Sequence, residues 1–281
     1  MLSYRHGYHA GNHADVLKHL CQLILLEKLA QKDKPFVYID THAGAGLYDL
    51  QSEQAQKTAE YEQGIDRLMQ LQSANPHICR YQALVGEYHQ QHRYPGSPEL
   101  AFRLCREHDS LQLMEWHNQE VLNLKANFKD RRNVHIHHRN GFEGLVALCP
   151  PKPARGMVLI DPSYELPQDY VEVVESVKAA QKRWAGGTFA IWYPMLAKAR
   201  DKSQTMLDGL SQLPVEQVLN IQLWVGAQPD DFGMYGSGMV IINPPWQFDE
   251  QVESLLQVLP TSLSDSPDAG ARCQWLRNTQ G

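Results

Sequence analysis

The chain has 281 residues, of which 43% are hydrophobic, so it is long enough to bury a full core as one large domain with an insertion. Its formal net charge of −6 excludes a protein coated in basic surface, and therefore nucleic-acid binding by bulk charge alone. No apolar run reaches the length of a membrane span, and the first residues lack the apolar stretch of a secretory signal, so we expect a cytoplasmic protein.

The first predicted elements are a long amphipathic helix and a buried strand. Asn12 is the expected N-cap of a helix over residues 13–31, in which apolar side chains recur at helical spacing: Val16, Leu17, Leu20, Leu23 and Ile24. The apolar run 36–40 then predicts a buried strand, and THAGAG (41–46) follows it at once. A strand that leads into a glycine-rich turn is the first half of a nucleotide-binding site.

Residues 47–93 predict a helical insertion, because this stretch is polar and contains two helical patterns separated by SANPH. We therefore expect an insertion subdomain over 47–93, with residues 1–46 and 94–281 forming the main domain. Directly after the insertion, YPGSPELAFRLCREH predicts a short helix with Ser97 as its N-cap and Pro98 at the first helical position.

The rest of the chain alternates predicted strands with predicted helices. The strands after the first are expected at 110–116, 134–139, 156–161 and 188–194. Such alternation predicts βαβ units and an α/β fold with a mainly parallel sheet covered on both faces. An antiparallel hairpin, expected from 217–225 and 239–243, would complete a seven-stranded sheet. The tail after Pro260 is rich in Ser, Asp, Pro and Gly, so we expect it to be loose.

The glycine turn gains meaning from an acid farther along the chain. Gly44 and Gly46 form only part of a GxGxxG fingerprint, and alone they are equally consistent with a turn that binds nothing. A cofactor-binding turn should be followed, roughly 20 residues on, by an acid that binds a ribose at the end of the next strand. Glu115 lies 69 residues beyond Gly46, and 22 beyond it once the 47-residue insertion is subtracted.

This spacing favours a cofactor with an adenosyl group, whose ribose hydroxyls would donate to the Glu115 carboxylate. A pyrophosphate would favour a helix N-terminus and basic residues after the glycine turn, whereas LYDLQSEQ follows it here. The sequence therefore favours S-adenosylmethionine over NAD as the cofactor.

Two similar tetrapeptides compete for the catalytic role. DPSY (161–164) ends the fourth parallel strand, which lies beside the first strand in a doubly wound sheet, so Asp161 should face the cofactor turn. NPPW (243–246) follows a strand that returns antiparallel, so it should lie at the opposite edge. We assign NPPW to structure, with Trp246 packing on the core.

DPSY suits methyl transfer to the N6 amine of adenine. Asp161 and the Pro162 carbonyl can each accept one N–H of the amine, and Tyr164 would stack on a base flipped out of its helix. The proton is then lost to Asp161 or to water. The alternative reading of DPSY is a strand-ending turn with an ordinary buried tyrosine, which we would prefer without the glycine turn and Glu115.

The ordered motifs MLSYRHGYHAGNHADVLKH, DTHAGAG, YPGSP, LMEWH, IDPSYE, WYP and SGMVIINPPW span nearly the whole chain. In this combination the chain resembles the large-subunit ribosomal RNA adenine-N6 methyltransferases of the J type. The resemblance implies a Rossmann-like methyltransferase fold with a helical insertion, S-adenosylmethionine as cofactor, and methylation of one adenine of large-subunit (23S) RNA. Some members of that family also carry the label of proteins involved in catabolism of external DNA.

The resemblance also implies site residues. Tyr4 would contact substrate, Asp161 would accept the proton, and the cofactor contacts would fall on His19, His42, Ser97, Glu115, Asn140, Gly141 and Asp161. The chain departs from the family pattern at two positions. Ser163 stands where the second proline of DPPY is usual, which loosens the loop, and Asn140 stands where an acid is common, which weakens adenine recognition.

The remaining basic residues and histidines give weaker signals. We expect no metal site, because the histidines at 6, 9, 13 and 19 lack an accompanying acid cluster. An RNA-binding patch is expected from Arg5, Lys18, Arg67, Arg80 and Arg93. The partner would be large-subunit ribosomal RNA before full ribosome assembly, bound by a monomer. Two alternatives stay open: a DNA adenine-N6 methyltransferase, and a non-methylating nucleic-acid-binding factor for the use of external DNA.

Overall fold

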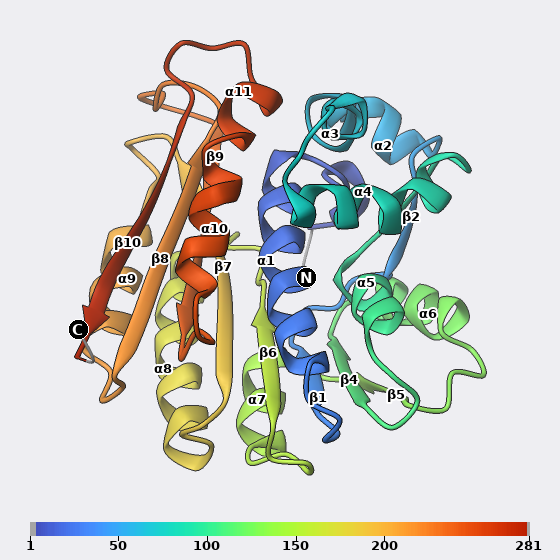
Figure 1. Ribbon diagram of the computed structural model, residues 1–281, viewed down its shortest axis with the longest axis vertical. Coiled ribbons are helices and arrows are strands. Elements are labelled where there is room, and N and C mark those ends of the chain that lie inside the picture. The colour runs from blue at the N-terminus through green and yellow to red at the C-terminus, as the bar shows by residue number, and fades with distance from the viewer. Residues whose placement is uncertain (1–3, 280–281) are drawn as a thin grey trace.

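The computed structural model describes residues 4–279 of the chain. A central sheet runs through the molecule, with helices on both of its faces (Figure 1). In spatial order its strands are β10 (Gly270–Asn278), β8 (Gln217–Trp224), β9 (Met234–Ile242), β7 (Thr188–Leu196), β6 (Gly156–Ile160), β1 (Val37–Asp40), β4 (Ser110–Glu115) and β5 (Val134–His138).

The strand directions confirm the predicted mainly parallel α/β fold with an antiparallel C-terminal hairpin. β5, β4, β1, β6 and β7 are parallel, whereas β9 pairs antiparallel with both β7 and β8. β6 is thus the fourth parallel strand and lies directly beside β1, as the choice between the two tetrapeptides requires.

The prediction of a loose tail is wrong. Residues 259–263 form α11 (Leu259–Leu263), and β10 adds an eighth strand to the sheet by pairing antiparallel with β8. The turn-forming residues are confined to the stretch between these elements, while Cys273 and Trp275 pack against the core. An edge strand with half-buried side chains lacks the continuous apolar run that marks a central strand, which explains why the sequence did not reveal it.

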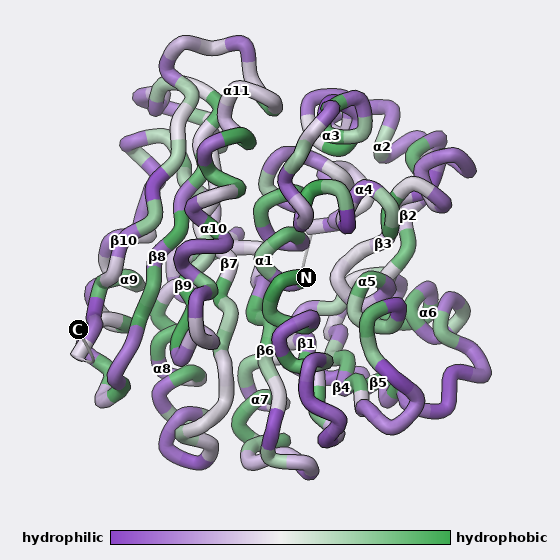
Figure 2. Tube along the Cα trace, in the orientation of Figure 1, coloured by the Kyte–Doolittle hydropathy of each residue, from purple (hydrophilic) through white to green (hydrophobic). Residues whose placement is uncertain are grey.

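Two hydrophobic cores lie on the two faces of the sheet. One core contains residues of α1 (His13–Ala30), α5 (Ser97–Leu104), α6 (Asn118–Asn127) and α10 (Phe248–Leu256). The other contains residues of α7 (Gly141–Leu148), α8 (Pro167–Arg183) and α9 (Ser203–Ser211). β1 serves both, since Tyr38 belongs to the first core and Ile39 to the second. In Figure 2 hydrophobic colour accordingly follows the strands through the interior. Nowhere in residues 4–279 does a helix have the length and apolarity needed to span a membrane.

α1 is buried nearly all round, because it packs between the sheet and the insertion. Asn12 caps it as predicted, accepting hydrogen bonds of 3.0 Å from the backbone N–H groups of Ala14 and Asp15. Thirteen of its 18 residues are buried, so the predicted amphipathic character is wrong in detail. The buried set includes four polar residues that share one stripe of the helix: Asp15, Lys18, His19 and Gln22.

The predicted insertion contains four helical segments between two short strands: α2 (Glu53–Thr58), η2 (Glu60–Gln63), α3 (Ile65–Gln70) and α4 (Pro76–His89). β2 (Leu47–Asp49) and β3 (Arg93–Pro95) pair antiparallel at its base. Strands of three residues are too short to show a period, so the sequence did not predict them. Ile65 and Tyr81 join the same core as α1. The division of the chain into two domains stays a prediction.

Two local predictions need correction. Ser97 is the first residue of α5 rather than its N-cap, which is Gly96, and its hydroxyl donates to Asp40 instead (2.7 Å). The NPPW segment does lie at the amino ends of the parallel strands, where Asn243 donates to the Gly187 carbonyl. Its tryptophan, however, does not pack on the core, since Trp246 is 83% exposed.

Candidate active site

A cavity of about 290 Å³ opens where β1, β4, β5 and β6 end, bordered by α1 and by η1 (His6–Tyr8). Doubly wound sheets bind their ligands at this edge. The structure brings most of the predicted site residues to its lining: Tyr4, His19, His42, Gly44, Ser97, Glu115, Asn140, Gly141, Asp161 and Pro162. Gly46 and Tyr164 are not part of that lining.

The glycine turn and Glu115 meet as the corrected spacing predicts. The Gly44 N–H donates to Glu115 Oε2 (2.8 Å), and the His117 N–H donates to Oε1 (2.6 Å). Gly44 has φ +58°, and a Cβ there would lie 2.2 Å from the Tyr48 hydroxyl oxygen. Burial raises the pKa of Glu115 above its ordinary value. Each carboxylate oxygen keeps a second lone pair, so the group can accept from a pair of vicinal hydroxyls.

Gly46 supports the turn but is not part of the cavity lining, and its predicted role as a cofactor contact stays a prediction. A Cβ at Gly46 would meet the Phe128 ring at 2.5 Å, so this position faces α6. Its carbonyl accepts from the Gly96 N–H (3.0 Å), which ties the two ends of the insertion together.

The turn between β5 and α7 closes another side of the cavity. The Asn140 side-chain oxygen caps α7 by accepting from the N–H groups of Phe142 (2.8 Å) and Glu143 (3.1 Å). Gly141 touches the end of β1, where an added Cβ would lie 2.1 Å from the Thr41 carbonyl oxygen. Because the oxygen of Asn140 is used as a cap, its Nδ2 offers a donor where a carboxylate would offer only acceptors.

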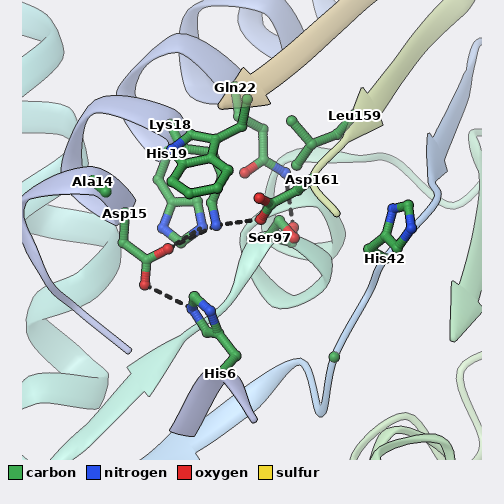
Figure 3. Close-up of polar contacts among 12 residues, drawn as sticks. His6, Ala14, Asp15, Lys18, His19, Gln22, His42, Ser97, Leu159 and Asp161 are labelled. Carbon is green, nitrogen blue, oxygen red and sulfur yellow. Dashed lines mark hydrogen bonds and ion pairs between the residues drawn. The ribbon is translucent and has the colours of Figure 1, made fainter. Parts of the chain in front are cut away.

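A chain of polar contacts connects Asp161 with the N-terminal segment (Figure 3). Lys18 Nζ lies 2.6 Å from Asp161 Oδ2 and 2.7 Å from Asp15 Oδ1. Asp15 Oδ2 lies 2.9 Å from His6 Nε2, and His6 Nδ1 lies 3.0 Å from the Tyr4 hydroxyl. Lys18 is only 4% exposed, so its predicted place in a surface patch for RNA is wrong.

The charged groups in this series of polar contacts stabilise each other. Burial acts to raise the pKa of Asp15, but His6 and Lys18 outweigh it and hold that pKa well below its ordinary value. Burial likewise acts to lower the pKa of Lys18, but Asp15 and Asp161 together raise it. Lys18 therefore keeps its proton at neutral pH and cannot serve as the base of a reaction.

His19 and His42 line the cavity as neutral imidazoles. Burial lowers the pKa of His19 to about 3 and that of His42 to about 4. His19 Nδ1 lies 2.7 Å from the Tyr94 hydroxyl, whereas its Nε2 is buried with no hydrogen-bond partner among the described residues. A buried polar atom without a partner is costly, so His19 Nε2 is suited to contact a ligand in the cavity.

Tyr164 is a core residue in this structure, which contradicts its predicted stacking on a base. Its hydroxyl donates to the Trp192 carbonyl (2.6 Å), and its ring packs 4.5 Å from that of Tyr170. Its backbone has φ +51°, and its side chain belongs to a hydrophobic core and not to the cavity lining. The alternative reading, a buried tyrosine in a strand-ending turn, describes its position correctly.

Sequence reasoning missed several residues that the structure gathers at the site. Asp15 and His6 were not singled out for catalysis, and Asp40 was treated only as the end of a strand. The available signal was the repeat of polar residues along an otherwise apolar helix at positions 15, 18, 19 and 22. Trp116 and Phe142 also line the cavity and supply two aromatic side chains.

Asp40 lies behind the cavity as a buried acid. Its Oδ2 accepts from the hydroxyls of Tyr38 and Ser97, both at 2.7 Å, and its Oδ1 accepts from the His42 N–H (3.2 Å). Burial raises its pKa to about 6, in spite of these donors.

This acid is expected to give the fold a pH dependence. Its ordinary pKa is 3.8, so between that value and about 6 the folded state binds a proton that the unfolded state has lost. The stabilisation is therefore complete below pH 3.8 and is lost as the pH rises through 6, by about 3 kcal/mol. Urea unfolding of wild type and Asp40→Asn from pH 4 to 7 measures this difference. Equal pH profiles for the two proteins would show that Asp40 does not titrate in this range.

No group of three or more His, Cys, Asp or Glu side chains in residues 4–279 has the arrangement of a metal site. His6 and His9 contact the carboxylates of Asp15 and Glu60 instead, at 2.9 Å each. These histidines hold the N-terminal segment against α1 and the insertion.

The doubly wound sheet, the glycine turn with its carboxylate, and the Asp-Pro-Ser-Tyr turn at the same edge define a Rossmann-like methyltransferase. Residues 33–277 match the family model described as "Ribosomal RNA large subunit methyltransferase D, RlmJ". The chain belongs to this family, as its motifs predicted.

Similar proteins cover the chain nearly end to end. It is 42% identical over 279 residues to "Ribosomal RNA large subunit methyltransferase J" of Escherichia coli (strain K12), covering 98% of this chain and 99% of that protein. The protein of the same name in Haemophilus influenzae is 41% identical over 280 residues, with the same coverage. A crystal structure of a Legionella pneumophila protein is 31% identical, with a TM-score of 0.84 over 97% of this chain and 99% of that one.

Proposed function

We propose that this protein transfers a methyl group from S-adenosylmethionine to the N6 amine of an adenine in large-subunit (23S) ribosomal RNA. Family membership supports ribosomal RNA as the substrate. The observation that carries the reaction type is the position of Asp161 and Pro162 in the same cavity as Gly44 and Glu115. The groups that accept hydrogen bonds from the substrate amine would thus lie at the same sheet edge as the cofactor.

The residues of the cavity fit S-adenosylmethionine, which supplies an electrophilic methyl group on a sulfonium. Glu115 would accept from the two ribose hydroxyls, and the partnerless Nε2 of His19 would contact the polar end of the cofactor. Asn140, Gly141 and His42 would hold the adenine side, and Ser97 would present hydroxyl lone pairs, since its proton is donated to Asp40.

The chain's own part in the reaction is to hold the amine and remove its proton. Lys18 donates to Oδ2 of Asp161, so Oδ1 is the oxygen that would accept one N–H of the adenine amine. The Pro162 carbonyl would accept the other N–H. The replacement of the usual proline by Ser163 keeps this acceptor, because the carbonyl belongs to the preceding residue. These two acceptors favour a pyramidal nitrogen with its lone pair exposed. The proton then passes to Asp161 or to water, and Tyr4 would contact the substrate.

The proposed function also has consequences for the stage of ribosome assembly, the cellular location and the oligomeric state. A base must leave its helix to enter the cavity, and proteins of an assembled ribosome would hinder this, so we infer that the RNA is methylated before assembly is complete. We infer that the enzyme works in the cytoplasm, where its substrate is made. We also infer that it works as a monomer, since one chain supplies all the groups named above.

Transfer of a labelled methyl group to protein-free RNA tests this function. The arms are large-subunit RNA, small-subunit RNA and adenine-containing DNA, each digested to nucleosides after reaction. We expect label in N6-methyladenosine from large-subunit RNA alone. Label in the DNA arm would favour the DNA adenine-N6 methyltransferase instead. Absence of label from all arms, with no binding of S-adenosylmethionine by calorimetry, would favour a non-methylating nucleic-acid-binding factor.

Glu115→Gln is expected to weaken binding of S-adenosylhomocysteine by about 10- to 100-fold. The amide removes a charge-assisted acceptor, and its NH₂ group would face the N–H of either Gly44 or His117. Calorimetry measures the affinity, and Glu120→Gln, in a second glutamate of the cavity lining, is the matched control. If both variants bind the product as wild type does, Glu115 does not hold the ribose.

A further inference from the structure

The loops at the amino ends of the five parallel strands form a face opposite to the cavity, at the bottom of Figure 1. We call it the amino-end face, and it comprises residues 31–36, 105–109, 128–133, 149–155 and 182–187. None of these residues lines the cavity. β6 alone separates the two ends by five residues, or about 17 Å at 3.3 Å per residue.

This face is one continuous surface, because side chains of each loop bond to the backbone of the next. Four such bonds join a side-chain donor to a backbone carbonyl: Arg106 donates to Lys32 (3.0 Å), Arg155 to Lys34 (2.7 Å), Asn133 to Arg106 (3.2 Å) and Trp184 to Ala154 (2.7 Å). The NPPW turn joins the same surface through the bond from Asn243 to Gly187 (2.9 Å). The charges on these loops are therefore held close together.

The amino-end face is basic, although the protein is acidic. It carries ten of the 26 Lys and Arg residues but only four of the 32 Asp and Glu residues. One of the four acids, Asp109, pairs with Arg106 (2.9 Å), so these two charges cancel within the face. Arg131 pairs with Glu99 of α5, which removes one of the ten, and a clear excess of positive charge remains. A concentrated positive face on a chain of charge −6 attracts a polyanion locally.

An exposed tryptophan stands beside these charges. Trp246 is 83% exposed, and its carbonyl accepts from Lys28 Nζ (3.0 Å). Asn243 anchors the start of the turn that carries it, by donating to the carbonyls of Ala185 and Gly187 (2.9 Å each). Lysine and arginine groups with an interleaved aromatic ring match the phosphates and bases of a nucleic acid, which bind by charge and by stacking.

We propose that the amino-end face is a second RNA-contacting surface, which binds a part of the substrate RNA remote from the base in the cavity. The inference rests on the proposed function. A flipped nucleotide cannot reach both ends of the sheet, so the RNA on this face must be a separate segment of a long molecule. An anionic membrane also attracts positive charge, but the single exposed side chain of Trp246 offers a membrane little apolar area to bury.

The test compares Lys152→Gln/Lys182→Gln with the control Lys125→Gln/Lys178→Gln, in which two exposed lysines outside this face are replaced. Affinity is measured for protein-free large-subunit RNA and for a short single-stranded RNA with one adenine, at several salt concentrations. For the long RNA we expect the first variant to lose roughly tenfold in affinity and about 2 in the slope of log K against log salt. Trp246→Ala should lose roughly tenfold as well.

The control variant and the short RNA should give wild-type values. The proposal is overturned if the two double variants bind long RNA equally well. It is also overturned if vesicles of anionic phospholipid bind wild type but not Lys152→Gln/Lys182→Gln while RNA binding is unchanged. Failure of the proposed function would give a different result. Wild type would then transfer no methyl group to the RNA, while the variants would still differ from wild type in RNA affinity.

Discussion

Asp161→Asn is expected to slow methyl transfer by about 10²- to 10⁴-fold. Asn keeps the size of the side chain, but it has one acceptor oxygen, and its NH₂ group must face either Lys18 Nζ or the amine of the substrate. Lys18 would then lie buried with only Asp15 as an anionic partner. Single-turnover rates with large-subunit RNA measure the effect on the chemical step.

Asp169→Asn is the matched control for this experiment, since Asp169 also lines the cavity but, within residues 4–279, accepts only from the Leu166 N–H at the start of α8. We expect it to react at nearly the wild-type rate. A rate for Asp161→Asn within tenfold of wild type would remove Asp161 from the catalytic role. In that case the Pro162 carbonyl alone would orient the amine.

Asp15→Ala is expected to lower the free energy of unfolding by about 3–5 kcal/mol, because it leaves Lys18 buried with half of its negative partners. Asp15 is 2% exposed, so water cannot replace the lost carboxylate. The variant also removes the acceptor of the Gly11 N–H and of His6, so the N-terminal segment should detach from α1. Urea unfolding at pH 7 measures the stability.

The pH dependence of this variant supplies a second readout. Because the folded-state pKa of Asp15 is depressed, its contribution is present above the ordinary pKa of 3.8 and is lost as the pH falls below that value. Wild type and variant should therefore converge in stability on acidification. Asp66→Asn is the control, since its contact with His89 is partly exposed and such a pair contributes about 1 kcal/mol or less. Equal losses of unfolding free energy in Asp15→Ala and Asp66→Asn would contradict a special role for the buried contacts among Asp15, Lys18 and His6.

Much of the fold could be predicted because its signals are local. Buried parallel strands appear as short apolar runs, and the intervening helices show caps and periodicity, so β1, β4, β5, β6 and β7 were all expected near their observed positions. Short or edge strands such as β2, β3 and β10 escape this reasoning, since their stability comes from pairing with a distant segment.

The site was predictable where one residue ends a strand and unpredictable where a helix face supplies the chemistry. Glu115 and Asp161 end strands, so topology alone brings them to one edge. Asp15 and Lys18 reach that edge only because α1 packs across the sheet with its polar stripe inward, which depends on tertiary packing. Tyr164 was misplaced for a similar reason: the motif fixes the turn, but packing against Tyr170 decides where the ring lies.

The hydrogen bond between Gly46 and Gly96 explains why subtracting the insertion restored the spacing to Glu115. The chain leaves the sheet and returns to it at nearly the same point, so the segment between adds almost nothing to the separation of its neighbours. Longer or shorter versions of this segment would cost little in loop-closure entropy, which grows only logarithmically with length. The insertion can therefore change in length with little effect on the catalytic pocket, because both of its ends stay joined at the edge of the sheet.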